Sequence, residues 1–231
     1  MSVQVPYKSG VIKLLIFDLD GTLIDSAPDI IATVNGLMAR RNLPSLPDDE
    51  ITAAIGEGLR ALVHKLFPEA KEGTPFKADL DREFLELYHL NMVKRTKPFS
   101  GVEEFLTDCP WKVAIVTNKT KALTDEMLAI LKLDRFPWVR VFGADSLAQR
   151  KPHPLPLQEA MRAAGVEPHE TLMIGDGIPD MAAAKAARVR AIAVEFGYLP
   201  KETLLALGAT HTLPSYKDLK NLITKLNSAA E

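Results

Sequence analysis

Short runs of apolar residues recur along this 231-residue chain and constrain its fold more than any other feature. Each run is almost entirely apolar, which is typical of parallel strands that are covered on both faces. The runs are 14–17, 113–117, 139–142, 172–175 and 191–194, and helical patterns over 121–131, 155–164 and 178–187 separate the later ones. This alternation predicts an α/β fold with a doubly wound (Rossmann-like) parallel sheet.

The stretch from 23 to 97 breaks the alternation, because it contains no convincing strand pattern. Helix starts are indicated at 26–29 and 47–50. Apolar faces follow at helical spacing, and the last of them comprises Phe76, Leu80, Phe84, Leu87 and Tyr88. We therefore predict a core domain over 1–22 and 98–231 with an inserted small all-helical cap domain over 23–97. Such an insert would lie over the carboxyl ends of the strands, where open α/β sheets bind ligands.

Composition and charge exclude several classes of protein. The formal net charge of −2 creates no global field that would attract DNA or RNA. No apolar stretch approaches the roughly 20 residues of a membrane helix. The single cysteine, Cys109, permits no intrachain disulfide, as is usual in a reducing cytosol. We expect a cytoplasmic monomer or homodimer with no nucleic-acid or membrane partner.

Two carboxylates, Asp18 and Asp20, follow the first apolar run directly. Side chains two residues apart in an extended strand point to the same face. Like charges held close together raise each other's pKa, and a nearby cation relieves that cost. The pair therefore indicates metal binding, proton transfer or nucleophilic attack. The alternative is a solvated turn, in which Asp and Gly are common.

Further polar residues stand where other predicted strands end. Thr117 and Asn118 follow the second run, and Asp176 and Asp180 follow the fourth. Prolines at 152 and 154 exclude a helix around Lys151 and hold it in an extended segment. An oxygen-rich edge of this kind suits Mg²⁺, which takes one or two carboxylates together with water and phosphate. A carboxylate can also attack phosphorus, while a lysine offsets the phosphoryl charge.

Together, the four motifs at Asp18–Thr22, Thr117, Lys151 and Gly175–Asp180 resemble the haloacid dehalogenase superfamily, in the expected order and at the expected strand ends. The helical insert is similar to the cap of that superfamily. The stretches 55–63 and 151–157 resemble its phosphoglycolate phosphatase subgroup. The chain departs from that pattern at Gly177, at Arg188 and at Glu195-Phe196-Gly197-Tyr198.

The resemblance implies roles for these residues. Asp18 would attack phosphorus to give an aspartyl-phosphate, and Asp20 would protonate the leaving oxygen and then activate water. Lys151 would restrain Asp18, and Thr117 with Asn118 would hold phosphoryl oxygens. Mg²⁺ would be bound by Asp18, Asp176 and the backbone carbonyl of Asp20. Asp180 would lie behind the metal ligands or bond Lys151.

We predict a Mg²⁺-dependent phosphatase for a small phosphorylated metabolite, with 2-phosphoglycolate as the first candidate. An aspartate at position 20 favours phosphatases and phosphomutases over dehalogenases, which lack it. A phosphomutase of the β-phosphoglucomutase type stays open, as do sugar phosphate, nucleotide and pyrophosphate substrates. A non-catalytic phospho-binding protein is a further alternative, disfavoured by the intact Asp20 and Asp180. Arg60, in the insert, could meet a substrate carboxylate or be a solvated helix arginine.

Overall fold

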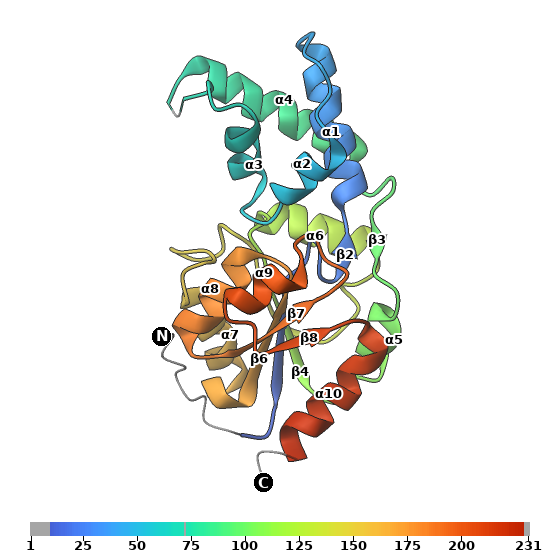
Figure 1. Cartoon of the computed structure of the whole chain (residues 1–231), viewed down its shortest axis with the longest axis vertical. Helices are drawn as coiled ribbons and strands as arrows, with labels where there is room; N and C mark the ends of the chain where they lie inside the picture. Colours follow the sequence, from blue (N-terminus) through green and yellow to red (C-terminus); the bar gives the residue numbers. More distant parts are fainter. Residues whose placement is uncertain (1–9, 72, 229–231) are drawn as a thin grey trace.

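The computed structural model describes residues 10–71 and 73–228. These residues form two parts, a sheet covered by helices and a separate group of helices (Figure 1). Its central sheet has six parallel strands in the order β5-β4-β1-β6-β7-β8. The strands are β1 (Leu14–Phe17), β4 (Lys112–Val116), β5 (Trp138–Phe142), β6 (Thr171–Gly175), β7 (Arg190–Val194) and β8 (His211–Leu213). The predicted α/β class and the five predicted strands are confirmed, and β8 is an addition.

Helices cover both faces of this sheet, as a parallel sheet requires. They are α5 (Val102–Thr107), α6 (Lys121–Ile130), α7 (Leu155–Ala164), α8 (Ile178–Ala187), α9 (Lys201–Ala206) and α10 (Tyr216–Ser228), with a short 3₁₀ turn, η1, at Pro168–Glu170. Alternate residues of β1 point to opposite faces: Leu14 and Ile16 pack in the cluster that includes α7 and α8, and Leu15 and Phe17 in the cluster that includes α5 and α10. All four side chains are fully buried.

Four helices lie together beyond one end of the sheet (Figure 1). They are α1 (Ala27–Arg40), α2 (Asp48–Ala53), α3 (Leu59–Leu66) and α4 (Pro75–Asn91). The apolar faces of α1 and α4 pack against each other through buried residues such as Val34 and Phe84. Phe76 departs from the predicted apolar face of α4: it is 41% exposed, because it lies at the start of the helix, where the Arg41 guanidinium covers its ring.

A two-stranded antiparallel ladder joins this helical segment to the sheet. Strands β2 (Ile24–Asp25) and β3 (Lys97–Pro98) pair side by side, so both chain crossings lie together. The prediction that 23–97 contains no strand is wrong at these two-residue strands, which are too short to show a periodic pattern. Over the described residues, no helix combines the length and the apolar character that crossing a bilayer requires.

Candidate active site

The predicted site residues converge on one edge of the sheet, because parallel strands place their carboxyl ends together. Asp18 follows β1, Thr117 follows β4 and Asp176 follows β6. The backbone N–H of Asp18 donates to the Ile174 carbonyl (3.0 Å), which extends the ladder up to the site. All three side chains are buried although they are polar.

Lys151 lies between two of the carboxylates at this edge. Its Nζ is 2.9 Å from Asp18 Oδ1 and 2.6 Å from Asp180 Oδ1, and its side chain is wholly buried. The surrounding segment is a turn, closed by a hydrogen bond from the His153 N–H to the Arg150 carbonyl, and not the extended segment that the prolines predicted. The turn nevertheless places the Lys151 ammonium beside Asp18.

Burial and mutual repulsion disturb the ionisation of these carboxylates. Burial, followed by the charge of Asp180, raises the pKa of Asp18 to about 7, although Lys151 opposes the shift. Burial and the charges of Asp18 and Asp180 raise the pKa of Asp176 well above its usual value. The Lys151 ammonium alone therefore leaves this group short of positive charge.

The same carboxylates form a cluster that fits a divalent cation. Asp18, Asp176 and Asp180 each offer an oxygen, and these oxygens lie within 4.8 Å of one another. Hard oxygen donors of this kind suit Mg²⁺. Asp176 is held in place from both sides, since the Thr22 hydroxyl (2.9 Å) and the Tyr198 N–H (3.0 Å) donate to its two oxygens.

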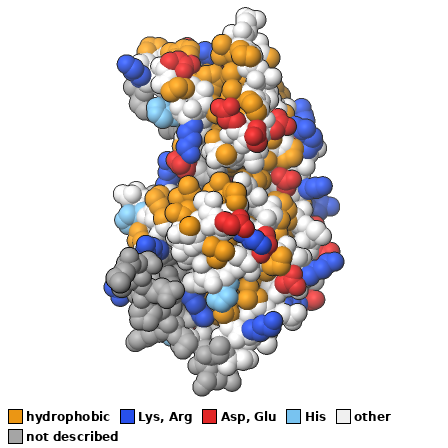
Figure 2. All heavy atoms as spheres, viewed as in Figure 1, with side chains coloured by type: hydrophobic (Ala, Val, Ile, Leu, Met, Phe, Trp, Pro, Cys, Tyr) orange, Lys and Arg blue, Asp and Glu red, His pale blue; other side chains and the backbone are white. Residues whose placement is uncertain are grey.

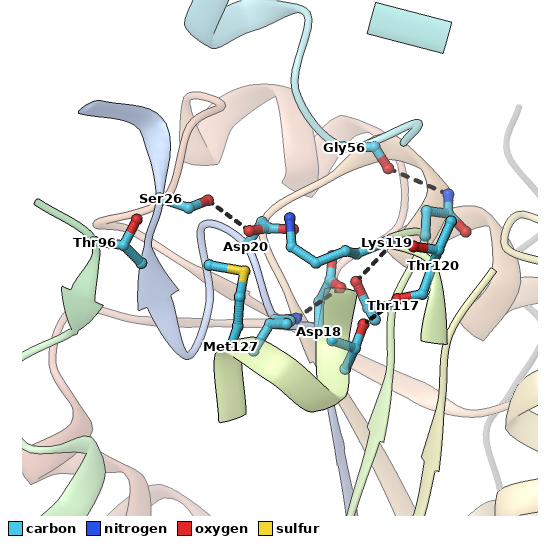
Figure 3. A network of polar contacts seen from close by, with 12 residues as sticks. Asp18, Asp20, Ser26, Gly56, Thr96, Thr117, Lys119, Thr120 and Met127 are labelled. Carbon is cyan, nitrogen blue, oxygen red and sulfur yellow. Dashed lines mark hydrogen bonds and ion pairs between the residues drawn. The ribbon is translucent and has the colours of Figure 1, made fainter. Parts of the chain in front are cut away.

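Asp20 has a different environment from Asp18, although only one residue separates them. The Ser26 hydroxyl donates to its Oδ1 (2.5 Å), and Lys119 Nζ lies 3.0 Å from its Oδ2 (Figure 3). Its side chain is therefore not part of the cluster around Lys151. Asp18 thus pairs with Lys151 and Asp20 with Lys119, so the two carboxylates can have different chemical roles.

Asn118 joins the core to the helical segment. Its side-chain amide donates to the Lys151 carbonyl (3.0 Å) and to the Gly56 carbonyl (3.2 Å). Its Oδ1 is buried and has no hydrogen-bond partner among the described residues. Beside it, Thr117 Oγ1 accepts the Lys119 N–H (3.2 Å).

Sequence reasoning missed Lys119 and Tyr198. Lys119 is 3% exposed and donates from Nζ to the Tyr88 hydroxyl (2.9 Å) of α4. The Tyr198 hydroxyl accepts the N–H groups of Ser26 (2.8 Å) and Ala27 (3.0 Å), so it holds the start of α1. A lysine two residues after Thr117, at the end of a buried strand, was the available signal for Lys119. For Tyr198 the sequence offered only its place in a loop that departs from the subgroup pattern.

Core and helical segment enclose a small cavity at this site. The space-filling view shows the outline narrowing between the two parts (Figure 2). The cavity volume is about 20 Å³, little more than one water molecule needs. Its lining residues are Asp18, Asp20, Thr117, Asn118 and Lys119 from the core, and Ile30, Ile55, Gly56, Gly58 and Leu62 from the helical segment. Arg60 lies in α3, but its side chain is outside the described part, so its role stays a prediction.

Comparison with known families agrees with this geometry. The family model for haloacid dehalogenase-like hydrolases matches residues 15–194, a span that includes every residue of the cluster. The chain belongs to this family.

Curated relatives of the chain include phosphatases. A phosphoglycolate phosphatase from Caulobacter vibrioides is 36% identical over 220 residues, covering 92% of this chain and 91% of the relative. One from Chromobacterium violaceum is 34% identical over 218 residues, covering 92% and 96%. A solved structure described as a predicted phosphoglycolate phosphatase, from Haemophilus somnus 129PT, has a TM-score of 0.83 at 26% identity and covers 92% of this chain and 98% of that one. This haloacid dehalogenase-like hydrolase is therefore a phosphatase.

Proposed function

We propose that the protein is a Mg²⁺-dependent phosphatase that hydrolyses a small phosphorylated metabolite through an aspartyl-phosphate on Asp18. 2-Phosphoglycolate is the first candidate substrate, because curated relatives are named phosphoglycolate phosphatase. The observation that carries the proposal is the separation of the two aspartates: Asp18 contacts Lys151 (2.9 Å), and Asp20 contacts Lys119 (3.0 Å). One carboxylate is thus placed to attack while the other is held apart to move a proton.

In the first step, an Asp18 oxygen attacks phosphorus and the ester P–O bond breaks. Asp20 gives its proton to the leaving oxygen, so that an alcohol departs and not an alkoxide. In the second step, water attacks the aspartyl-phosphate while Asp20 takes a proton from it, and phosphate leaves Asp18 free. Lys151 holds Asp18 in position, and Thr117 with Asn118 provides hydrogen-bonding groups for phosphoryl oxygens.

Mg²⁺ would be held by Asp18 and Asp176 with the backbone carbonyl of Asp20, and Asp180 offers a further carboxylate oxygen beside them. The ion would supply positive charge that offsets the phosphoryl group. This fit is supported by the raised pKa values of Asp18 and Asp176, because a cation relieves both.

The helical segment would serve as a cap over this site, with 23–97 as the cap domain and 1–22 and 98–231 as the core. A cavity of about 20 Å³ cannot admit a phosphoester, so the segment must withdraw to let the substrate enter. The two short strands β2 and β3 would be the hinge, since they connect both crossings of the chain.

A panel of phosphorylated metabolites tests the proposal, with phosphate release measured in Mg²⁺ and again in EDTA. The panel includes 2-phosphoglycolate, nucleotides, pyrophosphate and sugar phosphates, and isomer formation is followed for the sugar phosphates. We expect release of phosphate from at least one compound and its loss in EDTA. Isomer formation without phosphate release would indicate a phosphomutase, and no turnover of any compound would contradict the proposal.

A further inference from the structure

Lys119 is a buried cation in the cavity wall, and the proposed chemistry uses it only to hold Asp20. Its Nζ has two polar partners among the described residues, Asp20 Oδ2 (3.0 Å) and the Tyr88 hydroxyl (2.9 Å), and it lies over the Tyr88 ring. An ammonium has three N–H donors, so one is left over. Burial of an incompletely partnered cation is costly, which indicates that a further anion belongs there.

Tyr88 also has a donor that is poorly used. Its hydroxyl hydrogen points to the Met127 sulfur at 3.6 Å, and a thioether is a weak acceptor. Lys119 and Tyr88 together therefore present two donors at one place, from the core and from α4 respectively. An anion between them would be bound by both parts of the molecule at once.

Asp20, the carboxylate partner of Lys119 among the described residues, also has to transfer a proton in the proposed chemistry. Both oxygens of Asp20 are occupied, Oδ1 by the Ser26 hydroxyl and Oδ2 by Lys119. When Asp20 carries the proton that it gives to the leaving oxygen, it is neutral and holds the Lys119 ammonium less strongly. If it releases Lys119, the ammonium needs another anion, and an anionic substrate would bring one into the cavity.

We propose that Lys119, assisted by Tyr88, binds a carboxylate that the substrate carries close to its ester oxygen. Lys119 then selects short carboxylated phosphoesters over neutral ones. The other groups that the helical segment contributes to the cavity lining are apolar side chains or glycine backbone, and none of them is a cation. Lys151 cannot take this part, because Asp18 and Asp180 already engage it. The inference rests on the proposed phosphatase function and deepens it.

The test compares kcat/KM for 2-phosphoglycolate with kcat/KM for ethyl phosphate, which has the same phosphoester without the carboxylate. Lys119→Met should lower the ratio of the two values by about 10- to 100-fold, as expected for the loss of a charged hydrogen bond. Tyr88→Phe is the milder variant and should lower it by about 2- to 10-fold. Lys65→Met, at a lysine exposed on α3, is the matched control and should leave the ratio unchanged. Arg60→Met tests the other candidate for the substrate carboxylate.

Binding gives a readout that does not depend on turnover. In the Asp18→Asn background with Mg²⁺, calorimetry should show 2-phosphoglycolate binding more tightly than ethyl phosphate, and Lys119→Met should remove the difference. A ratio that is unchanged in both Lys119→Met and Tyr88→Phe would overturn the inference, as would a ratio that collapses only in Arg60→Met. Equal wild-type kcat/KM for the two esters would overturn it while leaving the phosphatase intact. Hydrolysis of no phosphoester would instead contradict the proposed function.

Discussion

Gly58 of the helical segment lies directly against Asn118 of the core: a Cβ at Gly58 would come within 2.7 Å of the Asn118 carbonyl oxygen. The backbone of Gly58 also has a φ of +93°, which L side chains rarely adopt. Gly58 and Asn118 both line the cavity that contains Asp18, so a glycine at this point sets how closely the two parts can approach each other.

Gly58→Ala should therefore lower both stability and activity. We expect the free energy of unfolding to fall by about 1–3 kcal/mol and kcat/KM to fall by about 10- to 100-fold, because the helical segment is displaced from the site. Gly73→Ala is the matched control: its φ is +78°, but nothing lies within 4 Å of its Cβ position. It should lose stability and keep its activity, and an equal loss of activity in both variants would contradict the contact.

Mg²⁺ should stabilise the fold through the buried carboxylates. At a concentration about 100 times its Kd, a ligand that binds only the folded state adds about 2.7 kcal/mol. Thermal unfolding with Mg²⁺ and with EDTA should show this gain in the wild type and little of it in Asp176→Asn. Asp134→Asn, on an exposed loop, should gain as much as the wild type. A full gain in Asp176→Asn would place the metal elsewhere.

The metal-free protein should lose stability as the pH rises from about 4 to about 7. The pKa of Asp18 is about 7 in the folded protein against 3.8 ordinarily, so in this range the folded state binds the extra proton. Stability falls with pH wherever the folded state binds more protons than the unfolded chain, here by on the order of a few kcal/mol. Urea unfolding in EDTA across this range measures the slope. Asp18→Asn should reduce it, and an identical slope in that variant would contradict the raised pKa.

Arg188 ends α8 in the left-handed region, with a φ of +59°. An exposed non-glycine residue in this conformation is strained by about 1–2 kcal/mol. Arg188→Gly should therefore raise the free energy of unfolding by about 0.5–1 kcal/mol, after the extra flexibility of glycine in the unfolded chain is subtracted. Ala186→Gly, exposed within the same helix, should lower it by about 1 kcal/mol. A loss of stability in both would mean that the arginine is not strained.

Most of the sheet and the acidic cluster could be predicted from the sequence, because both follow from short-range pattern. A parallel sheet brings its carboxyl ends to one edge, so Asp18 and Asp176 had to lie near each other once their strands were recognised. The short strands β2, β3 and β8 could not be recognised, since two or three residues show no period. Arg188 ends α8 in the left-handed conformation, where a glycine usually stands, and an arginine in the sequence does not indicate that conformation.

The contacts between core and helical segment were beyond sequence reasoning for a different reason. Periodicity predicts that Tyr88 is buried, which is correct, but it does not say that its hydroxyl meets Lys119, 31 residues away in sequence. The same holds for Tyr198 and the start of α1. Such contacts depend on how the core and the helical segment pack against each other, and a local sequence pattern does not predict that packing.

Phosphate release by Asp18→Asn tests the central claim most directly. The substitution keeps the size of the side chain and removes the attacking oxygen's charge, so release from 2-phosphoglycolate in Mg²⁺ should fall by about 10³-fold or more. Asp134→Asn makes the same chemical change on an exposed loop and should release phosphate as the wild type does. Circular dichroism should show both variants folded. Asp18→Asn that still releases phosphate near the wild-type rate would contradict the assignment of Asp18 as the nucleophile.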